Sequence, residues 1–192
     1  FRPPPPAPPA PPIQPIVATV PPIAAAATDA EMTAAGRAWS RTLSDRETAA
    51  IAAYKGDLGK VLNAALRRSQ GGVPRLYAPV VEDLDAAIGR SKAPRALTVF
   101  RGVKDLAWLR GKVVGDRGEL AGYTSTSIRR RVAKTFRGDG LLVIDVPEGY
   151  PAAYVHHLAP TGKAQFELLV ARGARYEIVE IGDREFRLRI LP

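Results

Sequence analysis

Polar side chains interrupt three otherwise apolar segments that have the composition of β-strands. These are Arg101 in TVFRG, the Ser-Thr-Ser run at 125–127 in GYTSTS, and Glu167 in QFELLV. Each one alone has an ordinary explanation: an edge-strand charge, a β-favouring threonine, or a solvated face. Together they would hold one cation, a pair of hydroxyls and one carboxylate on rigid strands, which predicts a single site.

The third segment carries two polar residues. Gln165 and Glu167 are two positions apart, so a strand would turn both toward one face and Phe166 and Leu168 toward the other. We therefore expect Gln165 and Glu167 to share the predicted site.

Helical patterns come before these strands. Residues 29–70 are expected to be helical, with Ser44 as an N-cap and Glu47 three residues later in a capping-box pattern. The QGG run at 70–72 ends this region, and VEDLDAAIGRS predicts one more short helix. From Pro94 onward the chain predicts strands, in the segments ALTVFRG, GYTSTS, LLVIDV, QFELLV, RYEIVEI and FRLRIL. Helices followed by strands indicate an α+β fold rather than an alternating α/β sheet.

The N-terminal segment has a different composition. Residues 1–22 contain eleven of the eighteen prolines, a density that prevents regular helix and sheet hydrogen bonding. We expect residues 1–28 to be a disordered proline- and alanine-rich tether, in preference to a ligand for a proline-binding domain, and residues 29–192 to be the folded domain. Because the chain begins with Phe1, we expect it to be part of a longer polypeptide.

Composition limits the function classes. A net charge of +9 favours polyanionic partners such as nucleic acid or phosphate-bearing ligands, with an ordinary basic surface as the alternative. Cysteine is absent, which excludes disulfides, thiolate metal sites and a cysteine nucleophile. The two histidines, His156 and His157, are adjacent and would point to opposite faces of a strand, so no metal site is expected. No apolar run is long enough to span a bilayer, and no membrane insertion is expected.

In order and context, these motifs resemble those of the ADP-ribosyltransferase toxins of the Arg–Ser–Glu class. That family carries an aromatic–Arg strand, a Ser-Thr-Ser strand and a Gln-x-Glu or Glu-x-Glu strand. The resemblance covers residues 40–190 and includes an upstream pattern at Tyr54, Gly56, Asn63 and Arg67. It implies a helical lobe packed on two roughly perpendicular β-sheets, antiparallel or mixed, with an NAD cleft between them.

The resemblance also implies roles for the three strand motifs. Arg101 would hold an NAD phosphate with its planar, permanently charged fork. Glu167 would stabilise the oxocarbenium-like ribose that forms when nicotinamide leaves, and Ser125 would hydrogen-bond that glutamate. Thr126 belongs to the NAD-binding strand. NAD is thus expected as a substrate, without a metal.

Further NAD contacts follow from the same resemblance. Phe136 would stack on the nicotinamide ring, with a core anchor as the alternative, and Arg137 stands beside it as a phosphate contact. Gly102 would let its backbone approach the nicotinamide amide. Asn63 and Arg67, one helical turn apart, would reach the adenylate side.

Gln165 bears on the acceptor. In the family, glutamate at this position accompanies arginine acceptors, whereas a glutamine suits an amide or a nucleobase edge. The turn PTGKAQ lacks the usual aromatic, and Tyr154 is a candidate replacement. We expect a mono-ADP-ribosyltransferase toxin or effector domain acting on a non-arginine acceptor, with a protein amide favoured over a nucleic-acid base. An NAD glycohydrolase and a non-catalytic binding module are the alternatives.

The resemblance extends to the setting of such a domain. We expect a monomer that is secreted or delivered into the cytosol of a target cell as part of a larger polypeptide. A cognate immunity protein is a further possible partner.

Overall fold

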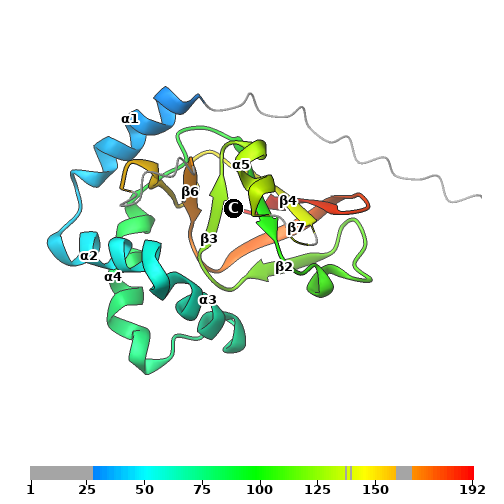
Figure 1. Cartoon of the computed structure of the whole chain (residues 1–192), viewed down its shortest axis with the longest axis horizontal. Helices are drawn as coiled ribbons and strands as arrows, with labels where there is room; N and C mark the ends of the chain where they lie inside the picture. Colours follow the sequence, from blue (N-terminus) through cyan, green and yellow to red (C-terminus); the bar gives the residue numbers. More distant parts are fainter. Residues whose placement is uncertain (1–27, 137, 139, 159–165) are drawn as a thin grey trace, which may run out of the picture.

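A computed structural model describes residues 28–136, 138, 140–158 and 166–192 (Figure 1). Helices gather in one lobe and most strands in the other, which is the α+β arrangement expected from the sequence. The segment 1–27 lies outside the described residues, and so do Arg137 and Gln165.

Among the described residues, four α-helices precede the first strand. Their bounds are α1 Asp29–Ser40, α2 Asp45–Ala53, α3 Gly59–Arg68 and α4 Ala78–Arg90. The predicted capping box at the start of α2 is confirmed: the Ser44 hydroxyl accepts from the Glu47 amide, and the Glu47 carboxylate accepts from the Ser44 amide at 2.8 Å. Both exchanges satisfy amide groups that a helix start leaves without intrahelical partners. A 3₁₀ turn at Arg75–Tyr77 leads into α4.

A π-helical turn, Tyr54–Leu58, joins α2 to α3. Gly56 departs from helical geometry inside this turn, with φ −83° and ψ −143°. The turn also brings the Tyr54 carbonyl against Gly59, where an added Cβ would lie only 2.3 Å from the Tyr54 oxygen. Glycine at position 59 is therefore required by close backbone contact.

The strands form one eight-stranded mixed sheet in the order β2-β7-β8-β4-β1-β3-β6-β5. All neighbouring pairs are antiparallel except β4 and β8, which are parallel. The strand bounds are β1 Leu97–Val103, β2 Arg117–Leu120, β3 Thr124–Ser127, β4 Gly140–Val146, β5 Ala152–Tyr154, β6 Glu167–Val170, β7 Ala174–Ile181 and β8 Glu185–Ile190.

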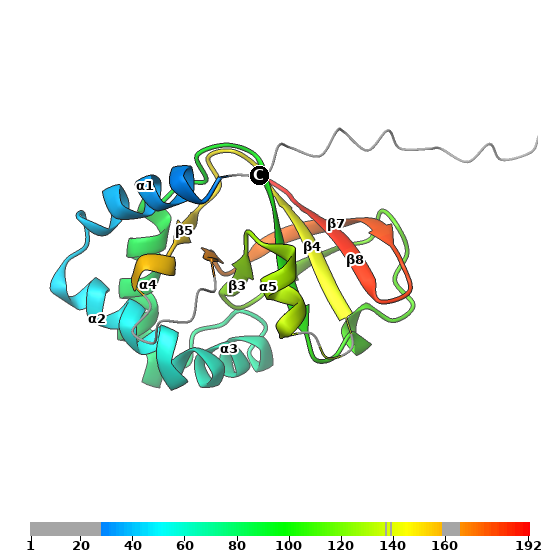
Figure 2. The ribbon, with the colours of Figure 1, turned by 45° about the horizontal axis from the view of Figure 1, so that its top comes forward.

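The two predicted sheets are joined in this structure. The five strands from β2 to β1 and the three strands β3, β6 and β5 meet through β1 and β3, which share a single register pair, Phe100 with Ser127. Helix α5, Arg130–Thr135, packs at this junction against β1 and β3 (Figure 2). Short 3₁₀ turns at Ala107–Leu109 and His156–Leu158 complete the described elements.

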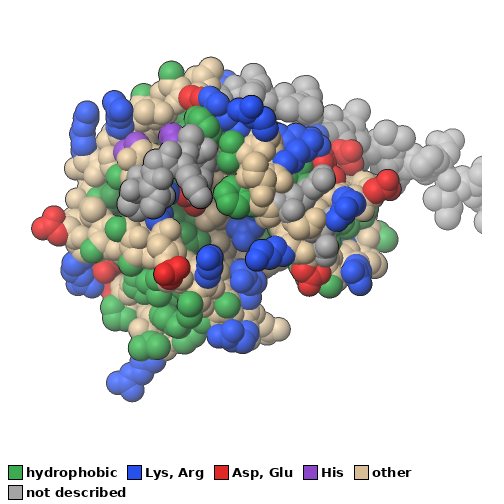
Figure 3. Space-filling model, in the orientation of Figure 1, with side chains coloured by type: hydrophobic (Ala, Val, Ile, Leu, Met, Phe, Trp, Pro, Cys, Tyr) green, Lys and Arg blue, Asp and Glu red, His purple; other side chains and the backbone are tan. Residues whose placement is uncertain are grey.

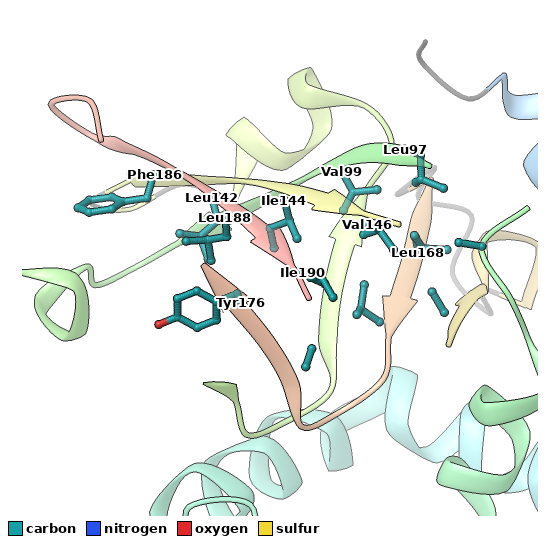
Figure 4. Close-up of a cluster of buried hydrophobic side chains, with 14 of the residues drawn as sticks. Leu97, Val99, Leu142, Ile144, Val146, Leu168, Tyr176, Phe186, Leu188 and Ile190 are labelled. Atoms are coloured by element: carbon teal, nitrogen blue, oxygen red, sulfur yellow. The ribbon is translucent and has the colours of Figure 1, made fainter. Parts of the chain in front are cut away.

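Two main buried clusters stabilise the molecule. One lies on the strands and includes Leu142 and Ile144 of β4 and Leu188 of β8, which Figure 4 shows side by side. The other packs the helices against the sheet and includes Trp39, Leu62 and Leu169. In β6, Leu168 belongs to the first cluster and Leu169 to the second. The two faces of this strand are therefore buried by different parts of the chain.

Two sequence expectations about strands need correction. Strand β6 begins at Glu167, and the residue before it, Phe166, has a left-handed φ of 48°. We expected Phe166 and Leu168 to point together away from the site. Because Phe166 precedes the strand, the alternation of side chains does not include it. The short strands β2 and β5 were not predicted, because four and three residues carry too little alternation to be recognised.

Candidate active site

The three predicted site residues lie on neighbouring strands. Arg101 is on β1, Ser125 on β3 and Glu167 on β6, and these strands are adjacent in the sheet. The Arg101 guanidinium donates to the Ser125 carbonyl at 3.1 Å. The register pairs Ser127 with Glu167 and Ser125 with Leu169. The structure thus brings together three residues that are separated by up to 66 positions in the sequence.

The Ser125 and Glu167 side chains face the helical lobe. Ser125 and Glu167 share their side of the sheet with Leu169, which belongs to the cluster that packs the helices. Thr126 and Leu168 take the opposite side, and the Thr126 hydroxyl donates to the Leu168 carbonyl at 2.7 Å. The Thr126 hydroxyl therefore supports strand pairing, and we assign it no contact with NAD.

Glu167 has a buried partner that sequence reasoning missed. The Lys55 ammonium lies 2.5 Å from the Glu167 Oε2 atom, and the two side chains are only 5% and 10% exposed. Lys55 comes from the π-helical turn, 112 residues away in the sequence. The only signal in the sequence was its position as the middle residue of the Tyr-x-Gly pattern.

Tyr54 connects the helical lobe to the Ser-Thr-Ser strand. Its hydroxyl accepts from the Asn63 side-chain amide at 2.8 Å, donates to the Tyr123 carbonyl and lies 3.5 Å from the Ser125 hydroxyl. Burial raises the pKa of Tyr54, which keeps the phenol neutral and able to donate. Asn63 is itself buried, with its amide nitrogen bound to Tyr54. In this structure the predicted NAD ligand Asn63 acts first as a support for Tyr54.

A pair of guanidinium groups marks the predicted phosphate side. Burial lowers the pKa of Arg101, and the positive charge of Arg67 acts in the same direction. Arg67 is exposed near the end of α3. The face in Figure 3 shows Lys and Arg side chains gathered between the helical lobe and the strands. Two neighbouring cations, one of them desolvated, favour an anionic ligand between them.

Phe136 is 55% exposed at the C-cap of α5. This exposure excludes the core-anchor alternative and leaves the ring available for stacking on a ligand. Gly102 is partly buried within β1, where it pairs with Leu141. Arg137 lies outside the described residues.

Phe166 is held in a stack next to Glu167. The Arg129 guanidinium lies 3.7 Å from the centroid of the Phe166 ring, and the His156 ring stacks on Phe166 at 4.8 Å with an interplanar angle of 22°. Burial lowers the pKa of His156, and the charges of Lys55 and Arg129 lower it further, so this imidazole is neutral at physiological pH. Tyr154, the aromatic suggested as an acceptor platform, is 2% exposed and belongs to the core instead.

The described part of the chain contains no group of three or more His, Cys, Asp or Glu side chains that could hold a metal ion. No helix among the described residues is long and apolar enough to cross a membrane.

Comparison with known proteins places this chain in a family. A family model described as ADP-ribosyltransferase exoenzyme matches residues 33–189. A comparison with curated protein sequences finds no match.

Solved structures of bacterial toxins share the fold. The C3 exoenzyme of Clostridium limosum superposes with a TM-score of 0.72 at 21% identity, covering 86% of this chain and 95% of that one. Plx2a, an ADP-ribosyltransferase toxin of Paenibacillus larvae, gives a TM-score of 0.74 at 21% identity over 84% and 93%. C3stau2 of S. aureus, solved with NAD, gives 0.71 at 20% identity over 84% and 95%.

Proposed function

The chain belongs to the ADP-ribosyltransferase exoenzyme family, and from this premise we propose how its site cleaves NAD and which acceptor receives the ADP-ribose. It is an NAD-dependent mono-ADP-ribosyltransferase of the toxin type, with NAD as its substrate. The observation that carries the assignment of roles is the position of Arg101, Ser125 and Glu167 on three adjacent strands, with the Arg101 guanidinium bound to the Ser125 carbonyl.

Arg101 and Arg67 bind the pyrophosphate of NAD. A guanidinium matches two phosphate oxygens at once, and the partial burial of Arg101 strengthens that attraction. The exposed Phe136 ring stacks on the nicotinamide, whose positive charge suits an aromatic face. These contacts orient the glycosidic bond toward Glu167.

Glu167 stabilises the transition state. The bond between the ribose C1′ and the nicotinamide nitrogen breaks, its electron pair goes to the nicotinamide, and positive charge develops on the ribose. A fixed carboxylate in a site that excludes water stabilises this charge more than water would. The acceptor nucleophile then forms a bond to C1′ and releases its proton. Each NAD thus yields one nicotinamide and one ADP-ribosylated acceptor.

We propose a protein side chain other than arginine as the acceptor, with an amide favoured. Gln165, on which this rests in the sequence, is neutral and suits an amide group.

Labelling of a target-cell lysate with radioactive NAD tests the acceptor. We expect macromolecular label that protease removes and nuclease leaves, with the modified side chain read by mass spectrometry. Modified arginine would contradict the acceptor proposal, and label that nuclease removes would assign a nucleic-acid base. Release of nicotinamide without labelled macromolecules would favour an NAD glycohydrolase.

The domain organisation is part of the proposal. Residues 29–192 form the transferase domain, and residues 1–28 tether it to the rest of a secreted or delivered polypeptide. The match of the family model to residues 33–189 supports these limits.

A further inference from the structure

Glu167 is held by Lys55 rather than by the serine that the family resemblance suggests. Among the described residues no hydrogen bond joins Ser125 to Glu167; the Ser125 hydroxyl lies 3.5 Å from Tyr54 Oη instead. The Lys55 ammonium donates to Glu167 Oε2 at 2.5 Å. We propose that Lys55 is the positioning residue of the catalytic glutamate. This inference rests on the proposed function of Glu167.

The pair differs from an ordinary surface ion pair. Both side chains are at least nine-tenths buried, so water competes little for either charge. Exposed pairs contribute little because solvent screens them, whereas a buried pair that loses one partner leaves an uncompensated charge. Contact with a fixed ammonium therefore restricts the Glu167 carboxylate to one orientation.

The backbone around Lys55 is itself fixed. Tyr54, its neighbour, is 4% exposed, and its hydroxyl is bound to Asn63 at 2.8 Å. The chain then kinks at Gly56, which lies outside helical geometry, and α3 begins at Gly59, which packs against the Tyr54 carbonyl. The turn places the Lys55 ammonium against Glu167, the first residue of β6.

Glu167 can bind the substrate while Lys55 holds its carboxylate, because one carboxylate oxygen stays available. A carboxylate has two oxygens and about four acceptor positions. Lys55 takes Oε2, and among the described residues no hydrogen bond reaches Oε1. The ribose hydroxyl of NAD can therefore bind Oε1 without displacing Lys55. Lys55 acts through Glu167 and needs no contact of its own with the substrate.

Steady-state nicotinamide release from NAD separates this role from that of Ser125. We expect Lys55→Met to lower kcat by about tenfold to a hundredfold, the range seen when a reacting group is misplaced by about an ångström. KM for NAD should change by less than about threefold, because the phosphate contacts remain. Lys55→Arg should recover most of kcat, since it restores a cation at Oε2.

Two further variants complete the comparison. Ser125→Ala should lose less kcat than Lys55→Met, and Lys112→Met, which removes an exposed lysine between β1 and β2, should match the wild type. If Lys55→Met does not fold, Lys55→Gln replaces it with the same expectation. A Lys55 variant with kcat within about twofold of the wild type would overturn the inference, and so would a larger loss in Ser125→Ala. A folded wild type that releases no nicotinamide would overturn the proposed function and this inference with it.

Discussion

Arg101 illustrates how a single side chain combines structural and functional contacts. One nitrogen of its guanidinium donates to the Ser125 carbonyl, which fixes the group between β1 and β3. The remaining donors are available for phosphate oxygens. A lysine has a compact point charge instead of a planar fork, so it cannot serve both purposes at once.

Arg101→Lys should therefore weaken NAD binding while the fold persists. The loss of one charge-assisted hydrogen bond, about 1.5 kcal/mol, corresponds to a rise in KM for NAD of about tenfold. Titration of nicotinamide release with NAD measures this change. Arg110→Lys, at an exposed position after the 3₁₀ turn that follows β1, is the matched control and should leave KM as it is. An unchanged KM in Arg101→Lys would remove Arg101 from phosphate binding.

The sequence predicted the strand residues of the site better than their partners. Arg101, Ser125 and Glu167 could be found because each is a polar exception in an apolar strand. Lys55 could not, since its contact with Glu167 depends on the π-helical turn and on tertiary packing. The predicted direction of the Phe166 side chain was wrong, because the left-handed backbone at this residue breaks the strand alternation. Local pattern rules do not contain either effect.

At the scale of elements, the junction of α2 and α3 positions Lys55 and Tyr54 together. The junction requires glycine at position 59 because the Tyr54 carbonyl would lie 2.3 Å from a Cβ. Gly89 in α4 is a useful contrast, since a Cβ there meets nothing within 4 Å.

Gly59→Ala should destabilise the protein by about 1–3 kcal/mol, the usual cost of inserting a methyl group into a packed site. It should also lower nicotinamide release, because the turn that carries Lys55 must shift. Gly89→Ala should instead be neutral or stabilise by up to about 1 kcal/mol, as expected for alanine in a helix. Urea denaturation measures both free energies of unfolding. Equal stability of the two variants would contradict the structure of this junction.

A second element-scale prediction concerns the start of α2. The Arg90 guanidinium and the Ser44 amide lower the pKa of Glu47 from 4.5 to about 2. Because the folded-state pKa lies below the unfolded one, this network stabilises the fold above about pH 4.5 and loses its effect as the pH falls through about 2.

Glu47→Gln should therefore be less stable than the wild type at pH 7, and the difference should shrink as the pH falls toward about 2. Urea denaturation of both proteins across this pH range measures the difference in free energy of unfolding. Glu82→Gln, which changes an exposed glutamate of α4, should follow the wild type at every pH. A stability difference for Glu47→Gln that stays constant with pH would contradict the assigned network.

At the scale of the whole molecule, a polar link ties the helical lobe to the sheet. Asp85 of α4 accepts from the Tyr123 hydroxyl at 2.6 Å and from the Arg172 guanidinium at 2.7 Å. Together with the buried cluster beneath the helices, this link fixes α4 against Tyr123, the residue directly before β3, which carries the Ser-Thr-Ser motif. The site thus lies where the helical lobe meets the sheet.

The order of helices before strands was enough to predict the fold class. The single continuous sheet was not predictable, because β1 and β3 are joined by one register pair that no local pattern encodes. The net charge of +9 agrees with an anionic substrate but cannot separate NAD from a polynucleotide.

The most direct test of the assigned chemistry compares nicotinamide release from NAD by the wild type, Glu167→Gln and Glu148→Gln. Glu148 is an exposed glutamate in the turn after β4 and provides the matched control. We expect Glu167→Gln to slow release by about a hundredfold or more, as removal of a transition-state charge partner does. Glu148→Gln should keep the wild-type rate, and thermal unfolding should show that all three proteins are folded. A folded Glu167→Gln variant that releases nicotinamide at the wild-type rate would contradict the assignment of Glu167 as the catalytic carboxylate.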